Sequence, residues 1–537
     1  MTVTDRFSPR RTSAPEVVVD GAHLTLDQVA AVARKQAAAV LSADPAVTAR
    51  IEAARDLCRT LVDRGVPVYG VTTGFGDSVT RQIDPSRAAD LQAHLIRNLG
   101  CGTGQVTSDA AGRAITLIRA NTLARGHSGV RTEVVTALLD LLDAGITPLI
   151  PEEGSVGASG DLVPLSYLAG AVTGTRPVHF GVETCDGADA LHRAGLEPLR
   201  LEAKEGLALV NGTAFMAGIA ALATVDARRL AALADACTAM ATEVLIGIST
   251  PFHPFIHDVA KPHPGQIRAA ARTRSLLEGS SLAQPYQAVV DRAGSSNGGF
   301  RQLDVAIQDK YSLRCAPQFT GVLWDTLTWV ERWLETEINA TTDNPLFDTA
   351  TATVVSGGNF SGGHVALAMD ALKVAVASVA DLLDRQMELV VDEKFSNGLT
   401  PNLVPPRDDS DPRRGLDHGF KGMQLACSSL TADALSRCMP LSVFSRSTEC
   451  HNQDKVSMGS TAARTTRDVV ALTEKVAAIH LLALCQAADL RGAERLGATR
   501  ELHRRVRAHV PPLDEDRPMD GDIGTVVALL HAGQLDI

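Results

Sequence analysis

The sequence lacks the patterns that mark three broad classes of protein. It has no long basic run and carries a formal net charge of −11, which argues against nucleic-acid binding and against an anionic membrane surface. Its nine cysteines form no CxxC pair and no Cys/His cluster at zinc spacing, so we expect buried, reduced thiols and no metal. The first fifteen residues are polar and lack the apolar stretch of a secretory signal. We therefore expect a cytoplasmic protein with a disordered N-terminal tail.

Glycine and proline are also absent from three stretches of roughly thirty residues, which predicts unusually long helices. These stretches are Ile219–Ile246, His364–Phe395 and Ser460–Arg491. All three are rich in Ala, Leu and Val, yet they contain charged residues such as Asp226 and Lys373, which exclude a membrane span. Helices that are apolar over most of their circumference are buried in a large bundle or between subunits.

Signals for β-strands are few and short, so the sequence predicts a mainly α chain. We expect a core of long bundled helices and a mixed N-terminal part. The predicted division is a disordered tail at 1–15, an N-terminal domain at 16–217, a central long-helix bundle at 218–490 and a C-terminal helical part at 491–537. Chemistry is expected in the polar, glycine-rich segments between the helices.

The most informative of these segments contains the small residues Ala158, Ser159 and Gly160. With so little side chain in the way, the backbone can fold back until the Gly160 nitrogen attacks the Ala158 carbonyl. Loss of water from that adduct and from the Ser159 hydroxyl would leave a ring with a conjugated exocyclic alkene, a strong electrophile. The competing interpretation is a plain turn before a helix capped by Asp161. A hydrolase nucleophile is disfavoured, because no glycine stands two residues after Ser159.

The surrounding residues favour the electrophile. The stretch GSVGASGDLVPLSYLAG resembles the signature of the ammonia-lyase family that carries 4-methylideneimidazole-5-one (MIO). That family includes histidine, phenylalanine and tyrosine ammonia-lyases and the matching 2,3-aminomutases. The resemblance extends from about Pro67 to Glu515 through VYGVTTGFG, EGLALVNGT, YSLRCAPQ, TTDNPLF, GGNFSGG and HNQDKVSMG. It implies the helical fold of the histidine and phenylalanine ammonia-lyases, MIO built from Ala158-Ser159-Gly160, no external cofactor or metal, and a homotetramer with sites shared between subunits.

The resemblance also assigns roles to individual residues. Tyr69 matches the base that removes the β-proton, and because the pKa of tyrosine is ordinarily about 10, we expect its site to lower that value. Tyr311 matches a second catalytic tyrosine. Arg314 matches the residue that binds the substrate carboxylate, for which a guanidinium offers two parallel hydrogen bonds. Asp161 either assists ring closure or caps a helix. The further substrate-binding positions implied are Gly76, Leu162, Asn211, Gln318, Asn344, Phe360, Lys421, Glu449 and Gln453.

The substrate side chain is expected to meet Asn98 and Leu99, which match the pair that largely sets the family's side-chain pocket. Histidine ammonia-lyases place Ser-His there, phenylalanine lyases commonly Phe-Leu and several tyrosine lyases His-Leu. Leu99 therefore argues against histidine, and the Asn98 amide could bind a phenolic hydroxyl. The alternative is that Asn98 bonds backbone and takes no part in selectivity.

The predicted activity is elimination of ammonia from tyrosine or phenylalanine to give coumarate or cinnamate, and the alternative is an aromatic 2,3-aminomutase. Glu449 and Lys421 resemble the phenylalanine-lyase pattern and pull against a simple bacterial tyrosine lyase. An argininosuccinase-like lyase would lack the Ala-Ser-Gly core. A catalytically inactive binding subunit would not be expected to retain Tyr69, Ser159 and Arg314.

Overall fold

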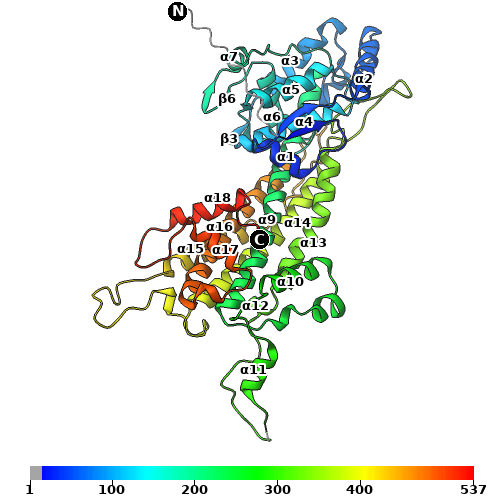
Figure 1. The fold of residues 1–537 in the computed structure, drawn as a ribbon. Helices are drawn as coiled ribbons and strands as arrows, with labels where there is room; N and C mark the ends of the chain where they lie inside the picture. The colour runs from blue at the N-terminus through cyan, green and yellow to red at the C-terminus, as the bar shows by residue number, and fades with distance from the viewer. Residues whose placement is uncertain (1–14, 297) are drawn as a thin grey trace, which may run out of the picture. The chain divides into compact units, whose positions relative to one another are not determined.

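The computed structural model describes residues 15–296 and 298–537. Helices dominate the described residues and strands are short, which confirms the predicted mainly α fold (Figure 1). The predicted disordered tail at 1–15 lies outside the described residues except for Pro15.

The chain forms two compact units, each assembled from three stretches. The first unit comprises the chain up to Leu222 together with Glu331–Met369 and Leu441–Arg464. The second unit comprises Ala223–Val330, Asp370–Pro440 and Thr465–Ile537. These units follow spatial contacts rather than chain order, and the linear division made from the sequence stays a prediction.

The first unit packs short helices against small sheets. Its helices are α1 (Leu26–Ala33), α2 (Pro45–Asp63), α3 (Ala88–Asn98), α4 (Asp109–Ala124), α5 (Thr132–Ala144), α6 (Leu162–Val172), α7 (Gly187–Arg193) and α8 (Glu205–Val210). Its strands are β1 (Glu16–Val19), β2 (Ala38–Leu41), β3 (Thr103–Val106), β4 (Ile146–Pro148), β5 (Pro151–Glu153), β6 (Val178–Phe180), β7 (Glu183–Cys185), β8 (Leu346–Asp348) and β9 (Thr353–Val355). Strands β1 and β2 pair in parallel, whereas β3–β5, β4–β6–β7 and β8–β9 are antiparallel.

Helix α4 forms the centre of the first unit. Every residue from Ala111 to Ala124 is buried, as expected for a helix enclosed by other elements. The helix begins where the Ser108 hydroxyl accepts a hydrogen bond from the Ala111 N–H at 3.2 Å. Helix α1 begins with a reciprocal cap between Thr25 and Gln28.

Four helices are much longer than the rest: α9 (Ala214–Val244), α13 (Ala316–Ile338), α14 (Gly363–Val391) and α16 (Gly459–Arg491). Three of them coincide with the stretches that lack Gly and Pro, so that prediction is confirmed. The remaining helices are α10 (Pro264–Leu276), α11 (Tyr286–Ala293), α12 (Tyr311–Arg314), α15 (Lys421–Ser436), α17 (Arg500–Arg507) and α18 (Asp520–His531).

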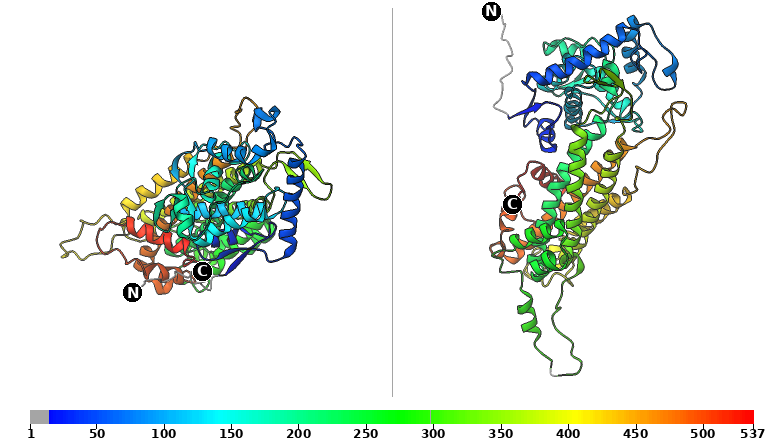
Figure 2. Two further views of the ribbon diagram at one scale, coloured as in Figure 1. Left: turned by 90° about the horizontal axis from the view of Figure 1, so that it is seen from above. Right: turned by 90° about the vertical axis from the view of Figure 1, so that its right-hand side faces the viewer.

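Within the second unit the long helices lie side by side (Figure 2). Buried polar side chains join them. The Trp324 indole of α13 donates to Asp235 of α9 at 2.8 Å. Gln386 of α14 donates to Thr238 of α9 at 3.0 Å and contacts the His480 ring of α16 at 3.2 Å. None of the helices in the described ranges combines the length and apolar character needed to cross a bilayer.

All nine cysteines are free thiols. Cys101 and Cys450 are exposed, so the expectation of uniformly buried thiols is wrong for these two. Both lie in segments between helices, where no packed helical surface covers the side chain.

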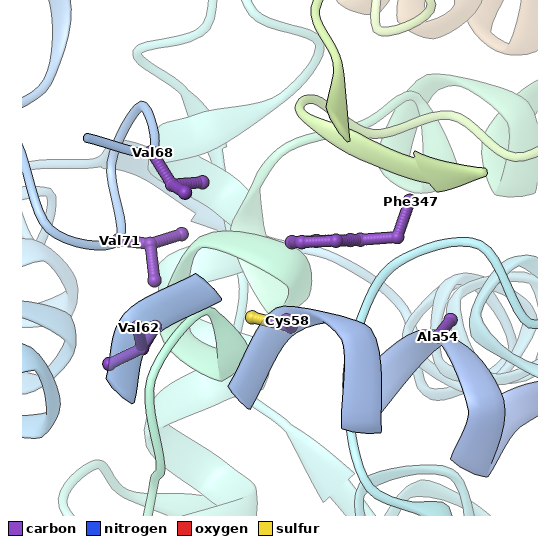
Figure 3. Packing of buried hydrophobic residues seen from close by; sticks show 6 residues of the cluster. All are labelled: Ala54, Cys58, Val62, Val68, Val71 and Phe347. Atoms are coloured by element: carbon purple, nitrogen blue, oxygen red, sulfur yellow. The ribbon is translucent and has the colours of Figure 1, made fainter. Parts of the chain in front are cut away.

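A small hydrophobic cluster holds β8 against α2 in the first unit. The Phe347 ring is fully buried and faces Cys58 and Ala54 of α2, with Val68 and Val71 at its edge (Figure 3). Val68 and Val71 flank Tyr69, so this packing also supports the segment that carries the predicted base.

We expect Phe347→Ala to lower the free energy of unfolding by about 3–5 kcal/mol, because it removes a fully buried ring from a packed cluster. Chemical denaturation would measure the loss. Phe300→Ala is the matched control, since the Phe300 side chain is 92% exposed. Equal stability of the two variants would contradict the role of the cluster.

Candidate active site

The Ala158-Ser159-Gly160 segment lies between β5 and α6 and approaches other backbone closely. Gly160 has φ of +68°, and a Cβ there would overlap the backbone of Gly212. Gly157 has φ of +67°, and a Cβ there would overlap the Ser457 hydroxyl. Both positions therefore require glycine, which accounts for the small residues of the segment.

The N-termini of several helices meet beside this segment. Asp161, which directly precedes α6, accepts a hydrogen bond from the Met216 N–H in the first turn of α9 at 2.9 Å. It also accepts one from the Ser460 hydroxyl at the start of α16. The start of α14 is close as well, since a Cβ at Gly362 would overlap the Met216 sulfur. Unpaired N–H groups and helix dipoles give such a region positive potential.

Burial raises the pKa of Asp161 to about 6, although the hydrogen bonds from Ser460, the Met216 N–H and Ser155 oppose that shift. The Ser155 hydroxyl donates to its carboxylate at 3.0 Å. Asp161 occupies the N-cap position of α6, as the competing interpretation predicts, but its side chain makes no cap bond to that helix. It serves the first turn of α9 instead. Neither Ser155 nor Ser460 was identified from the sequence.

Two predicted amides contact Ser159. Asn211 donates from Nδ2 to the Ser159 carbonyl at 3.2 Å, and Gln453 donates from Nε2 to the Ser159 hydroxyl at 3.2 Å. The Oδ1 atom of Asn211 is buried and has no hydrogen-bond partner among the described residues. The glycine-restricted backbone, the two donors on Ser159 and this unused acceptor fit an MIO group built from residues 158–160.

Tyr69 is half-buried in the loop after α2. Its hydroxyl accepts a hydrogen bond from the Gly76 N–H at 3.0 Å. Burial raises the pKa of Tyr69, the Gly76 N–H lowers it, and the Glu449 carboxylate raises it further. The expectation that the site lowers the pKa of Tyr69 is therefore wrong for the single chain. Burial and the negative charge of Glu449 outweigh the one hydrogen bond from Gly76.

A tight hairpin at residues 448–453 connects the Tyr69 loop with the Ser159 segment. Its two ends pair through backbone hydrogen bonds between Thr448 and Gln453. The Glu449 carboxylate accepts the Asp77 N–H at 3.1 Å, and a Cβ at Gly76 would overlap it. Residues 449–451 all have positive φ, a costly conformation for side chains other than glycine. That strained turn places Glu449 beside the base loop while Gln453 reaches Ser159.

The predicted selectivity pair lies at the C-terminal end of α3, with Asn98 as its last residue and Leu99 as the C-cap. Asn98 is exposed and has no hydrogen-bond partner within residues 15–296 and 298–537, and Leu99 is half-buried. The hydroxyl of Tyr167 accepts the Gly102 N–H at 3.1 Å, so this tyrosine anchors the segment after the pair in addition to packing. Leu162, at the first position of α6, is half-buried.

Two further predicted residues lie near β8 and α14. Asn344 is buried, and its Oδ1 accepts the Gly357 N–H at 2.8 Å. It follows Asp343, whose carboxylate pairs with the fully buried Lys204 at 2.7 Å. Phe360 is half-buried immediately before α14.

The remaining predicted residues belong to the second unit. Arg314 and Gln318 line an open cavity of about 330 Å³. The Arg314 guanidinium lies 4.5 Å from the centre of the Tyr311 ring, and its Nε donates to the Asp309 carbonyl at 3.1 Å. Its two terminal nitrogens make no hydrogen bond to the described part of the chain, which leaves them free for a carboxylate. Tyr311 is 71% exposed, and Lys421 is exposed at the start of α15.

Comparison with known proteins identifies the family of the chain. The model of the aromatic amino acid lyase family matches residues 24–508. The chain belongs to this family. The resemblance inferred from the sequence segments is thereby confirmed.

Individual relatives of this lyase-family chain differ in activity. A histidine ammonia-lyase of Anaeromyxobacter sp. (strain K) is 41% identical over 97% of this chain and 99% of its own length. A tyrosine ammonia-lyase of Cupriavidus metallidurans is 40% identical over 96% of each chain. The crystal structure of a tyrosine aminomutase from Streptomyces globisporus superimposes with a TM-score of 0.92 at 36% identity, over 97% of this chain and 98% of that one.

We expect Glu449→Gln to lower the pKa of Tyr69, because it removes one of the two causes that raise it and keeps an oxygen to accept the Asp77 N–H. The measurement is the tyrosinate absorbance of each protein against pH, with Tyr69→Phe subtracted. Glu183→Gln, at a carboxylate that pairs with Arg193 on the surface of the same unit, serves as the control. A Tyr69 pKa that is unchanged or higher in Glu449→Gln would refute the electrostatic coupling.

Proposed function

We propose that this chain is a carbon–nitrogen lyase that eliminates ammonia from tyrosine or phenylalanine to give coumarate or cinnamate. The observation that carries the proposal is the Ala158-Ser159-Gly160 segment, which lies at converging helix N-termini with Asn211 and Gln453 both donating to Ser159. Membership of the aromatic amino acid lyase family supports it.

An MIO group formed from residues 158–160 would supply the electrophile that captures the substrate amine. Removal of an amine is otherwise difficult, because an amine is a poor leaving group. The Asn211 donor would polarise the carbonyl of Ser159, and the buried Asn211 acceptor, which has no partner among the described residues, would be available to a protonated nitrogen.

Tyr69 is proposed to remove the β-proton. Its hydroxyl already accepts one hydrogen bond, from Gly76, and that bond favours the phenolate. Arg314 is proposed to bind the substrate carboxylate through a bidentate contact, because its two terminal nitrogens have no hydrogen-bond partner among the residues that the structure describes.

We further propose a homotetramer in which subunits share the sites. Large apolar side chains are exposed on α13, α14 and α15, where a soluble monomer would ordinarily carry polar residues. The exposed residues are Phe319, Val322, Leu367, Val374 and Leu425.

The proposed substrate follows from the pair at the end of α3. The Asn98 amide is exposed and unpaired within the described chain, so it is available to a phenolic hydroxyl, and Leu99 offers an apolar contact to the ring. The alternative function is an aromatic 2,3-aminomutase, favoured by the similarity to the tyrosine aminomutase structure.

A substrate panel tests the function. L-Tyrosine, L-phenylalanine and L-histidine would each be incubated with the protein, and mass spectrometry would identify the acrylic acid, ammonia and any β-amino acid. Coumarate or cinnamate without β-amino acid supports the lyase, and accumulating β-amino acid supports the aminomutase. Turnover of histidine alone would overturn the proposed substrate class.

Intact mass tests the electrophile independently of any substrate. We expect the chain to be lighter than its sequence by two waters, about 36 Da, because ring closure and loss of the Ser159 hydroxyl each release one. The Ser159→Ala variant lacks that hydroxyl and cannot lose the second water. An unmodified wild-type mass would exclude the MIO group.

We expect Asn98→Leu to reduce kcat/KM for tyrosine relative to phenylalanine by roughly ten- to a hundredfold, because the phenolic hydroxyl would lose its hydrogen-bond partner. Steady-state kinetics on both substrates give the ratio. His94→Leu, at an exposed position of the same helix, adds a similar apolar side chain and should leave the ratio unchanged. An unaltered ratio in Asn98→Leu would mean that this amide does not select the substrate.

A further inference from the structure

Gln92 is a fully buried amide in the middle of α3, with 0% of its surface exposed. Its Nε2 donates to the Gly70 carbonyl at 2.9 Å, and its Oε1 accepts the Leu207 N–H at 2.8 Å. One end of the amide must face a carbonyl and the other an N–H, so the geometry allows only one orientation of the side chain.

These two hydrogen bonds join three elements that carry predicted site residues. Gly70 directly follows Tyr69 in the base loop. Leu207 lies in α8, which ends one residue before Asn211. Helix α3 itself ends at Asn98. A single amide therefore links the base loop, the helix that leads to the donor on Ser159, and the helix that carries the proposed selectivity residue.

Apart from the packing of Val68 and Val71 in the Phe347 cluster, the base loop has few other hydrogen bonds to the rest of its unit. Its first half is bonded internally, from the Val68 N–H to the Thr72 hydroxyl at 2.9 Å and from the Gly70 N–H to the Thr73 hydroxyl at 3.2 Å. Among the described residues, only the bonds from Gln92 to Gly70 and from the Asp77 N–H to Glu449 connect residues 66–80 to distant segments.

We propose that Gln92 is a positioning residue that holds the Tyr69 backbone at the distance from α8 required for β-proton removal. This inference rests on the proposed function, in which Tyr69 is the base. Gln92 does not touch the reacting atoms. Its effect on the reaction passes through the Gly70 carbonyl, because a displacement of that peptide displaces the tyrosine beside it.

The test compares Gln92→Met with a matched control, Gln486→Met. Gln486 is also buried, at 2% exposed, and also bonds two backbone groups, since it donates to the Leu513 carbonyl at 2.9 Å and accepts the Leu513 N–H at 2.9 Å. It belongs to the second unit and, within the described residues, makes no hydrogen bond to a predicted site residue. Both variants lose the same amide, so their thermal stabilities should fall similarly.

Only Gln92→Met should impair proton removal. We expect its kcat to fall about 10- to 100-fold with a small change in KM, as for a misplaced catalytic group. The mass should still show the loss of two waters. With β,β-dideuterated substrate, the kinetic isotope effect on kcat should exceed that of the wild type, because proton removal has become slower relative to the other steps. Gln486→Met should keep the wild-type isotope effect.

A second measurement needs no substrate. Hydrogen–deuterium exchange of the amides in residues 68–76 should be faster in Gln92→Met than in the wild type, and unchanged in Gln486→Met. Equal exchange in all three proteins would overturn the inference whatever the activity. A wild type that turns over no aromatic amino acid would instead count against the proposed function, and the exchange measurement would still decide the link to Gly70.

Should Gln92→Met fail to fold, Gln92→Glu answers the same question. The neutral acid can donate to the Gly70 carbonyl, whereas the carboxylate cannot and repels it. We therefore expect the activity of Gln92→Glu relative to the wild type to fall as the pH rises. A constant ratio across the pH range would overturn the proposal.

Discussion

The candidate site depends on one buried carboxylate. Asp161 binds the first turn of α9 through the Met216 N–H, the first turn of α16 through Ser460 and the loop before α6 through Ser155. A buried carboxylate is costly unless donors surround it, and helix N-termini supply such donors. The same convergence that satisfies Asp161 surrounds the neighbouring Ser159 with positive helix ends. Burial nevertheless raises the pKa of Asp161 to about 6, which means that keeping this buried carboxylate ionised costs free energy.

Around this centre, the reactive residues lie in loops whose positions are set by side chains bonded to backbone. Asn211 holds the Ser159 carbonyl, Glu449 holds the Asp77 N–H and Gln92 holds the Gly70 carbonyl. Side chain-to-backbone bonds of this kind fix a loop without requiring regular secondary structure in it. Candidate site residues from loops that are distant in the sequence can therefore lie close together. The long helices support these loops.

Identity over the whole chain indicates the family of this protein but not its substrate. Relatives with nearly equal identity to this chain, 41% and 40%, are a histidine ammonia-lyase and a tyrosine ammonia-lyase. Similarity across the whole chain therefore reflects the shared fold and the shared elimination chemistry. It does not distinguish the substrates, because a single hydrogen bond in a pocket can change relative rates by orders of magnitude without changing the overall identity.

The sequence by itself determined three of the four long helices, since a stretch of thirty or so residues without Gly or Pro contains neither of the two residues that most disfavour a helix interior. It also identified the contiguous Ala158-Ser159-Gly160 segment. The family resemblance predicted Asn211 and Gln453, and both contact Ser159. Only the tertiary structure showed that Ser155 and Ser460 bond the neighbouring Asp161. The Glu449 contact with the Tyr69 loop joins residues 372 positions apart, and the Ser460 contact with Asp161 joins residues 299 apart. The raised pKa of Tyr69 has the same origin, because burial and the charge of a distant residue leave no trace in the local sequence around a side chain.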